Sequence, residues 1–345
     1  MELTKYEDKG YTGLKNLGNT CFLNSCVQVL THTYELNNLL NMKIKNNQFK
    51  DIVDTELLKE YNELSTLIWE TTGTISPNKF VINVHKIAEK KDREIFTGYN
   101  QNDMPEFLLF LIDSMHNSLA RPSEVSITGK VKTNIDNIAV KCYEVIKNIY
   151  KKEYSEIMDL FYGMYITEIM SKDGKKIYNI IPEQFMILDL PIINNKECSI
   201  YDCLDNYVNY ETLEGENSWY NNETQQKEEI KKRTIFWSFP NILIIVLKRF
   251  SDDGRKKKLD QVNCPLKNLD LSRYINGYNA SKYVYDLYGV CNHIGNLQGG
   301  HYTTFIKTLK NEWVHFNDET VSKMQESNII TPMSYCLFYR KKNNL

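Results

Sequence analysis

The sequence predicts an α+β fold, in which a helical region is followed by a β-rich region. Up to about residue 125 the apolar residues recur at helical spacing, whereas from about residue 160 they lie in short runs rich in β-branched and aromatic residues. The 345 residues contain no internal repeat and no Pro-, Gly- or Ser-rich linker. We therefore expect a short N-terminal extension (1–10) followed by one continuous domain (11–345).

Composition and charge exclude several classes of protein. Hydrophobic residues make up 42% of the chain and charged residues 25%, which is typical of folded, soluble proteins. The net charge of -2 gives no reason to expect binding to nucleic acid or to an anionic membrane. The N-terminus lacks the apolar core of a signal peptide, and no stretch approaches a membrane-spanning helix. We expect a monomer in the cytoplasm, the nucleus or both.

The cysteines show no metal-binding or disulfide pattern. None forms a CxxC pair, and the six histidines supply no HxxxH motif. Reduced thiols and the absence of a structural metal are therefore expected. The eight cysteines are Cys21, Cys26, Cys142, Cys198, Cys203, Cys264, Cys291 and Cys336.

Apolar periodicity locates the predicted helices and strands. One helical face contains Leu23, Cys26, Val27 and Leu30, so Cys26 is interpreted as a core residue; another contains Met104, Phe107, Leu108, Leu111, Ile112, Met115 and Leu119. Strands are predicted within 185–192, 241–250, 283–290, 301–307, 313–316 and 335–340. The polar segment 216–233 is predicted to be a surface loop, either mobile or used for binding.

A candidate nucleophile lies near the N-terminus. In GLKNLGNTCFLNSCVQVL a Gly- and Asn-rich turn leads directly into an amphipathic helix, and Cys21 falls in its first turn. The positive end of a helix stabilises a thiolate, so a lowered pKa is expected for this thiol. The backbone N–H of Cys21 and the side-chain amide of Asn16 could together bind an oxyanion. Alternatively, Cys21 is only a small buried residue behind a helix cap.

A candidate base lies near the C-terminus, in a predicted hairpin spanning 295–318. Its first strand begins with His301 and its second ends with Asn317 and Asp318. Pairing about residue 309 would place His301 opposite Asn317 on one face and Asp318 on the other, although a bulge would exchange the last two. The Asn317 carbonyl would then accept the Nδ1 hydrogen of His301 and leave Nε2 facing the sulfur.

Glycines 299 and 300 precede this histidine and would permit close approach of a substrate backbone. The alternative for His301 is an ordinary strand histidine, and the same alternative applies to His315 and His293. His293 could also support the site from behind.

Together these segments resemble the cysteine and histidine boxes of the ubiquitin-specific proteases, which are papain-like deubiquitinases. The first box reads approximately GLxNLGNTCxxNSxxQxL and matches residues 13–30; the last reads GHYxxxxK followed by WxxFND and matches residues 300–318. Intervening segments such as FTGYNQNDMPEFLLFLID, LDLPI and NILIIVLKRF follow in the family's order. The resemblance therefore covers about residues 11–341.

The resemblance implies a papain-like cysteine protease with a helical thumb (about 11–125) and β fingers and palm (about 126–345). It implies hydrolysis of the bond after the C-terminal Gly of ubiquitin through a Cys21 thioester, with His301 as general base and acid, Asn317 orienting it, and Asn16 binding the oxyanion. Asp318 is the alternative orienting residue. Ubiquitin and ubiquitinated proteins are the implied partners. The alternatives are a catalytically silent ubiquitin-binding scaffold and a papain-like protease of other substrates.

In QNDMPEF, Asp103 and Glu106 occupy the positions at which the family binds the arginines of the ubiquitin tail. They also fit a capping box at the start of a helix, with Pro105 in its first turn, and both interpretations could hold. The family usually has Gln where Pro105 stands, which alters one contact at the helix start. Other residues expected at the substrate site are His293, Gly299, Gly300 and Tyr302.

Many members of the family carry two CxxC pairs in the fingers, and this chain has no cysteine at either place. We therefore expect no zinc and no other cofactor, with the fingertips held by apolar packing or additional hydrogen bonds.

Overall fold

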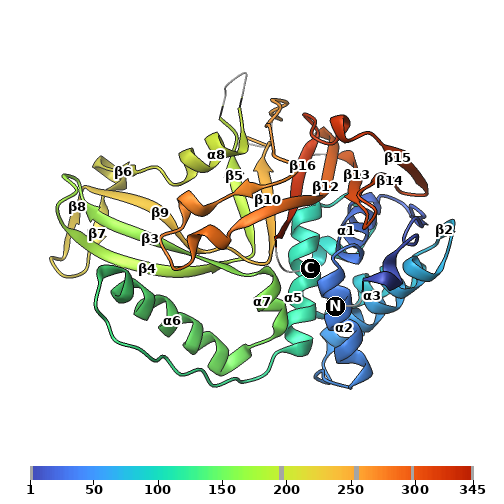
Figure 1. Ribbon diagram of the computed structural model, residues 1–345, viewed down its shortest axis with the longest axis horizontal. Coiled ribbons are helices and arrows are strands. Elements are labelled where there is room, and N and C mark those ends of the chain that lie inside the picture. The colour runs from blue at the N-terminus through green and yellow to red at the C-terminus, as the bar shows by residue number, and fades with distance from the viewer. Residues whose placement is uncertain (1–2, 194–197, 252–255, 297–298, 343–345) are drawn as a thin grey trace.

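The computed structural model describes residues 3–193, 198–251, 256–296 and 299–342. The predicted α+β organisation is confirmed, because helices of the N-terminal part pack beside a large sheet and a second, long sheet extends away from it (Figure 1). The helices of the N-terminal part are α1 (Cys21–Thr31), α2 (Tyr34–Lys45), α3 (Val53–Glu70), α4 (Asn78–Lys90) and α5 (Met104–Leu119).

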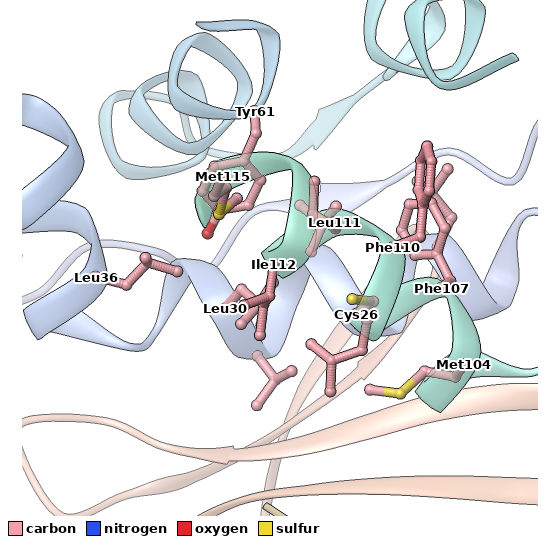
Figure 2. Close-up of a cluster of buried hydrophobic side chains, with 14 of the residues drawn as sticks. Cys26, Leu30, Leu36, Tyr61, Met104, Phe107, Phe110, Leu111, Ile112 and Met115 are labelled. Atoms are coloured by element: carbon pink, nitrogen blue, oxygen red, sulfur yellow. The ribbon is translucent and has the colours of Figure 1, made fainter. Parts of the chain in front are cut away.

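Helices α1 and α5 pack against each other in the core of this helical part. The apolar faces predicted for both helices are buried. Figure 2 shows Cys26 among Leu30, Met104 and Ile112, inside the cluster and away from solvent. The interpretation of Cys26 as a core residue is therefore confirmed.

The large sheet has the strand order β15-β14-β13-β12-β16-β10-β5, with β11 paired to β12. One apolar cluster joins this sheet to the helical part, and a second lies on its other face. Each predicted strand segment contributes a strand. The strands are β5 (Ile187–Pro191), β10 (Ile242–Lys248), β11 (Leu269–Asp270), β12 (Val284–Asn296), β13 (Gly299–Lys307), β14 (Trp313–Asn317), β15 (Thr320–Met324) and β16 (Ser334–Lys341).

The long sheet has the order β4-β3-β9-β6 and is covered at its base by helix α6, which was not predicted (Figure 1). This helix begins with a capping box, in which the Thr133 hydroxyl and the Asp136 carboxylate exchange hydrogen bonds with each other's backbone N–H. The elements are α6 (Asn134–Glu153), α7 (Glu156–Phe161), β3 (Gly163–Ser171), β4 (Ile177–Phe185), α8 (Ile200–Tyr207), β6 (Glu211–Leu213) and β9 (Ile230–Ser238).

The segment 216–233 is not a plain loop as predicted. It contains the hairpin β7 (Trp219–Asn221) and β8 (Gln226–Glu228) and the start of β9. The Trp219 ring stacks on Tyr178 at 5.7 Å, and Lys172 bridges Glu214 and Glu229 at 3.0 and 2.8 Å. Within the described ranges, His, Cys, Asp and Glu residues nowhere form a group of three or more that could hold a metal ion.

The N-terminal segment packs on the helices. Tyr6 is buried against the rings of Tyr34 and Trp69, at 5.0 and 4.7 Å. Strand β1 (Gly13–Leu14) then pairs in parallel with β2 (Thr74–Ile75). Among the described residues, no helix is long and apolar enough to cross a membrane. All eight cysteines are buried and free.

Candidate active site

A tight turn precedes α1, and Cys21 is the first residue of this helix. The backbone has positive φ at Gly18 (101°) and Asn19 (56°), which glycine and asparagine tolerate best. The Asn16 Oδ1 atom accepts hydrogen bonds from the backbone N–H groups of Gly18 and Thr20, at 3.1 and 3.2 Å. These bonds fix both the turn and the orientation of the Asn16 amide.

The fold brings Cys21 next to the strand that carries His301. Helix α1 packs against β13, and the backbone of Tyr302, the residue after His301, lies near enough to the Cys21 thiol to lower its pKa. His301 itself is partly exposed, with 38% of its side chain accessible. A nucleophile candidate from one end of the chain and a base candidate from the other thus share one site.

The pKa of Cys21 differs from the sequence-based expectation. Burial raises the pKa of this thiol above its ordinary value, and the nearby charge of Asp318 raises it further. The nearby Tyr302 backbone lowers the pKa but does not outweigh burial, since Cys21 is only 3% exposed. In this arrangement the sulfur is a thiol at neutral pH and requires a base to become a nucleophile.

The predicted contact between His301 and Asn317 is present, with 2.7 Å between Nε2 and Oδ1. Two details of the prediction are wrong. Strand β13 pairs Thr304 with Phe316, so the hairpin is centred on residue 310 and His301 lies diagonally to Asn317. The bond uses Nε2 and not Nδ1; when Nε2 donates to the Asn317 carbonyl, Nδ1 is left free to accept a proton.

The alternation of side chains along the hairpin predicted that Asp318 points away from the site. In the structure its carboxylate points toward the site. Its backbone is left-handed, with φ of 47°, so its carboxylate lies on the same side as Asn317. Asp318 Oδ2 accepts a hydrogen bond from Asn16 Nδ2 at 2.9 Å and lies 4.0 Å from His301 Nε2. The carboxylate therefore holds the amide that was predicted to bind an oxyanion.

Asn24 is a site residue that sequence reasoning missed. Its Nδ2 atom donates to Asp318 Oδ1 at 2.7 Å and lies 3.4 Å from the carbonyl oxygen of Leu14. The available signal was its spacing, because a residue three positions after Cys21 lies on the same helical face. Asn24 thus fixes the carboxylate from the side opposite Asn16.

Asp103 does not form the predicted capping box at the start of α5. Its carboxylate instead accepts hydrogen bonds from the hydroxyls of Tyr302 and Tyr335, at 2.7 and 3.2 Å. Burial raises the pKa of Asp103, and the tyrosine hydrogen bonds lower it. The two tyrosines tie the start of α5 to strands β13 and β16.

Asp103 and Glu106 line a cleft of about 340 Å³ between α5 and the strands β5 and β10. A third carboxylate, that of Asp189, also lines the cleft and was missed by the sequence analysis. Burial raises the pKa of Asp189, and the nearby charge of Lys248 offsets part of this increase. In the part of the chain that the structure describes, neither Glu106 nor Asp189 has a cation within 4 Å. Two cations, Lys248 and Arg249, line the same cleft, so its three carboxylates leave a small excess of negative charge. Its apolar walls are formed by Leu109, Ile187, Val246 and Phe250.

His293 lies behind the site and is buried. Its Nδ1 atom is 3.1 Å from Lys257 Nζ, which also donates to the His293 carbonyl oxygen at 2.5 Å. Burial and the charge of Lys257 lower the pKa of His293 to about 4, so its ring is neutral at neutral pH. The ring lies against Gly300, where an added Cβ would be 2.2 Å from His293 Nε2.

Gln101, also missed, connects the two walls of the site. Its Oε1 atom accepts a hydrogen bond from the Gly300 N–H, and its Nε2 donates to Asn19 Oδ1 at 3.3 Å. Gly299 faces the same side chain, with its Cβ position 3.2 Å from Gln101 Oε1. No sequence motif predicts this role for a single glutamine in a loop, because Asn19 and Gly300, which it bonds, are distant from it in the sequence.

Substituting Gly300 by alanine is expected to destabilise the protein by about 1–3 kcal/mol, the usual cost of overpacking. The new Cβ would lie 2.2 Å from His293 Nε2 and 2.5 Å from the Ile294 carbonyl oxygen. The Ile294 oxygen belongs to the backbone, which cannot move aside as easily as a side chain. Gly98→Ala is the matched control, because nothing lies within 4 Å of its Cβ position. Urea unfolding should leave that control within about 0.5 kcal/mol of the parent; equal effects of the two substitutions would contradict the packing argument.

Comparison with known proteins identifies the family. Residues 12–339 match the family model described as ubiquitin carboxyl-terminal hydrolase. The chain is 33% identical to ubiquitin carboxyl-terminal hydrolase 2 of Bos taurus, over 96% of this chain and 55% of that protein. It is 32% identical to the Gallus gallus protein of the same name, over 96% of this chain and 93% of that protein. The chain thus spans about half the length of the cattle relative.

Solved structures agree at the level of the fold. A SAGA DUB module of Ubp8, Sgf11, Sus1 and Sgf73 bound to monoubiquitin superposes with a TM-score of 0.74 and 22% identity, covering 98% of this chain and 70% of that one. The same module bound to ubiquitin aldehyde gives 0.73 and 22%, over 99% of this chain and 72% of that one. The fold is that of a papain-like protease. The chain belongs to the ubiquitin carboxyl-terminal hydrolase family.

Proposed function

We propose that this protein is a deubiquitinase that hydrolyses the peptide or isopeptide bond after the C-terminal Gly of ubiquitin. The observation that carries the proposal is the position of the Cys21 thiol at the start of α1, packed against the strand on which Asn317 holds His301. The names of the relatives, and the ubiquitin bound to proteins of the same fold, support ubiquitin as the substrate.

In this mechanism, His301 Nδ1 accepts the proton of the Cys21 thiol as the sulfur attacks the Gly carbonyl carbon. The tetrahedral oxyanion is bound by the Cys21 backbone N–H and by Asn16 Nδ2. Collapse forms a thioester, and the leaving amine takes its proton from His301. A water molecule, deprotonated by His301, then attacks the thioester and releases the carboxylate and the thiol.

The acidic cleft lined by Asp103 and Glu106 is proposed to bind the basic C-terminal tail of ubiquitin. Its three carboxylates and apolar walls suit arginine side chains, which combine a cationic end with an apolar stem. We further propose that residues 11–345 act as one catalytic domain and as a monomer, in the cytoplasm, the nucleus or both. The eight free thiols fit the reducing conditions of those compartments.

A ubiquitin probe carrying a C-terminal electrophile tests the proposal directly. The protein should become covalently attached to the probe through Cys21, as identified by peptide mass spectrometry. A ubiquitin-binding scaffold would not be labelled, and a general papain-like protease would cleave short unstructured peptides without ubiquitin. Related modifiers with the same electrophile, assayed in parallel, would show which modifier is preferred.

Replacing Asn317 and Asp318 separately is expected to give unequal losses. Asn317→Ala removes only the acceptor that orients His301 and should lower kcat by about 10–100-fold. Asp318→Ala releases the Asn16 amide as well as Asn24 and should lower kcat by about 10²–10³-fold, the usual effect of losing an oxyanion donor. Steady-state hydrolysis of a fluorogenic ubiquitin amide measures both, with thermal unfolding as the folding control. A larger loss for Asn317→Ala would contradict this division of roles.

A further inference from the structure

The segment that follows β10 brings a lysine next to the strand pair that carries the proposed base. Phe250 and Lys257 form an antiparallel β-bridge. Beside this bridge, the Lys258 N–H donates to the Arg249 carbonyl oxygen at 2.7 Å. From this position the Lys257 side chain reaches His293 on β12, the strand that pairs with β13.

Lys257 contacts His293 at two atoms. Its Nζ atom donates to the His293 carbonyl oxygen at 2.5 Å and lies 3.1 Å from the ring atom Nδ1. An ammonium group has only donors, so Nδ1 is the acceptor and the ring hydrogen is on Nε2. The lysine thus ties the backbone and the ring of one residue to each other.

The lysine carries its charge at neutral pH. Burial and the charge of Arg249 lower the pKa of Lys257 to about 8, which leaves most of it protonated at pH 7. The Lys257 charge is in turn one reason for the low pKa of His293, after burial. The His293 ring is therefore neutral and is hydrogen-bonded as one tautomer.

The His293 ring contacts both neighbours of the proposed base. His293 is paired with Tyr302 in the sheet, and the two rings are 4.7 Å apart. On the other side, the Cβ position of Gly300 lies 2.2 Å from His293 Nε2. Because side chains alternate along a strand, His301 points to the opposite face from Gly300 and Tyr302. The ring thus supports His301 through the strand backbone.

Aromatic rings enclose His293 on its other sides. Phe250 lies 5.5 Å away and Tyr335 6.0 Å away, between ring centres, and the charge of His301 also lowers the pKa of His293. Packing against rings barely distinguishes the two flipped positions of an imidazole, which are similar in shape. The hydrogen bond from Lys257 distinguishes them, because it requires a ring nitrogen at one place.

We infer that Lys257 is a positioning residue, which fixes the His293 ring and through it the strand that carries His301. The inference rests on the roles proposed above for Cys21 and His301. A displacement of about 1 Å in a reacting group can cost about 100-fold in rate, even when the substitution is far from the chemistry. Lys257 acts on the reaction only through this support.

The test compares two neighbouring lysines. Lys257→Met keeps the apolar stem beside Phe250 and removes the ammonium group, and Lys256→Met makes the same change at the adjacent, exposed lysine. With a fluorogenic ubiquitin amide we expect Lys257→Met to lower kcat by at least about tenfold. Its KM should stay within about twofold of the parent, because no substrate contact is removed. Lys256→Met should match the parent in both constants.

Two measurements without ubiquitin follow the structural link itself, at a temperature at which thermal unfolding shows every variant to be folded. Proton NMR titration should show a higher pKa for His293 in Lys257→Met, because a nearby positive charge is removed. Alkylation of Cys21 by iodoacetamide at pH 7 should be slower in the same variant, because the base is displaced. Neither property should change in Lys256→Met.

A parental kcat in Lys257→Met, an equal loss in Lys256→Met, or a loss confined to KM would overturn the inference. A lower kcat with an unchanged pKa of His293 would also overturn it, since the effect would not pass through the ring. Failure of the proposed function gives a different result: ubiquitin conjugates are not hydrolysed, yet alkylation of Cys21 still depends on Lys257. If ubiquitin is cleaved and Lys257→Met has no effect, the positioning role alone is wrong.

Discussion

Replacing Cys21 by alanine is expected to abolish hydrolysis of ubiquitin conjugates and to leave ubiquitin binding intact. Without the sulfur no thioester can form, and removal of a catalytic nucleophile typically lowers kcat by at least about 10⁴-fold. Binding should persist because the side chain is 3% exposed and contributes little surface to a ligand. Single-turnover hydrolysis and calorimetric titration with ubiquitin measure the two properties separately.

Cys26→Ala is the matched control for this substitution. It makes the same chemical change five residues further along α1, inside the core cluster shown in Figure 2. This control should lose stability through the cavity that it creates and should keep its kcat. Turnover that survives Cys21→Ala and is lost in Cys26→Ala would show that the nucleophile has been assigned to the wrong cysteine.

Replacing His301 by alanine is expected to lower kcat by about 10³–10⁴-fold, within the range for loss of a general base. The reason lies in the pKa of Cys21, which burial raises, so that little thiolate is present at neutral pH without a base. Since a raised pKa keeps the thiol protonated, the rate of Cys21 alkylation by iodoacetamide in the variant should rise as the pH increases. At pH 7 that rate should be lower than in the parent protein.

His315→Ala is the control for the base, because His315 lies on β14 of the same hairpin. Its ring packs against Phe305 at 4.9 Å, and it is not expected to contact substrate. The control should lose some stability and keep its alkylation rate at pH 7. If both substitutions slow alkylation equally, the base assignment is wrong.

The sequence was informative where the chemistry depends on local pattern. Helical spacing placed Cys21 at the start of α1 and Cys26 in the core. The contact between His301 and Asn317 was predicted although the hairpin centre was misplaced by one residue. Moving the hairpin centre from residue 309 to residue 310 shifts the partner of every residue by two positions. Residues two positions apart on a strand share a face, so Asn317 stays on the same face as His301.

Other features depend on contacts that no local pattern specifies. Strand alternation placed Asp318 on the wrong face, because a left-handed backbone at the strand end overrides that alternation. Asp103 does not form the predicted capping box, because its carboxylate accepts hydrogen bonds from hydroxyl groups on β13 and β16. The ring nitrogen that bonds Asn317 depends on where the imidazole enters the site, which is a tertiary property.

The position of β16 has a consequence for incomplete chains. This strand, formed by residues 334–341, lies between β12 and β10 in the middle of the large sheet (Figure 1). A polypeptide that stops before residue 334 would contain every proposed catalytic side chain but would leave the facing edges of β12 and β10 unpaired, and such edges promote aggregation. The large sheet can therefore be completed only after residues 334–341 have been synthesised, because they pair with both β10 and β12.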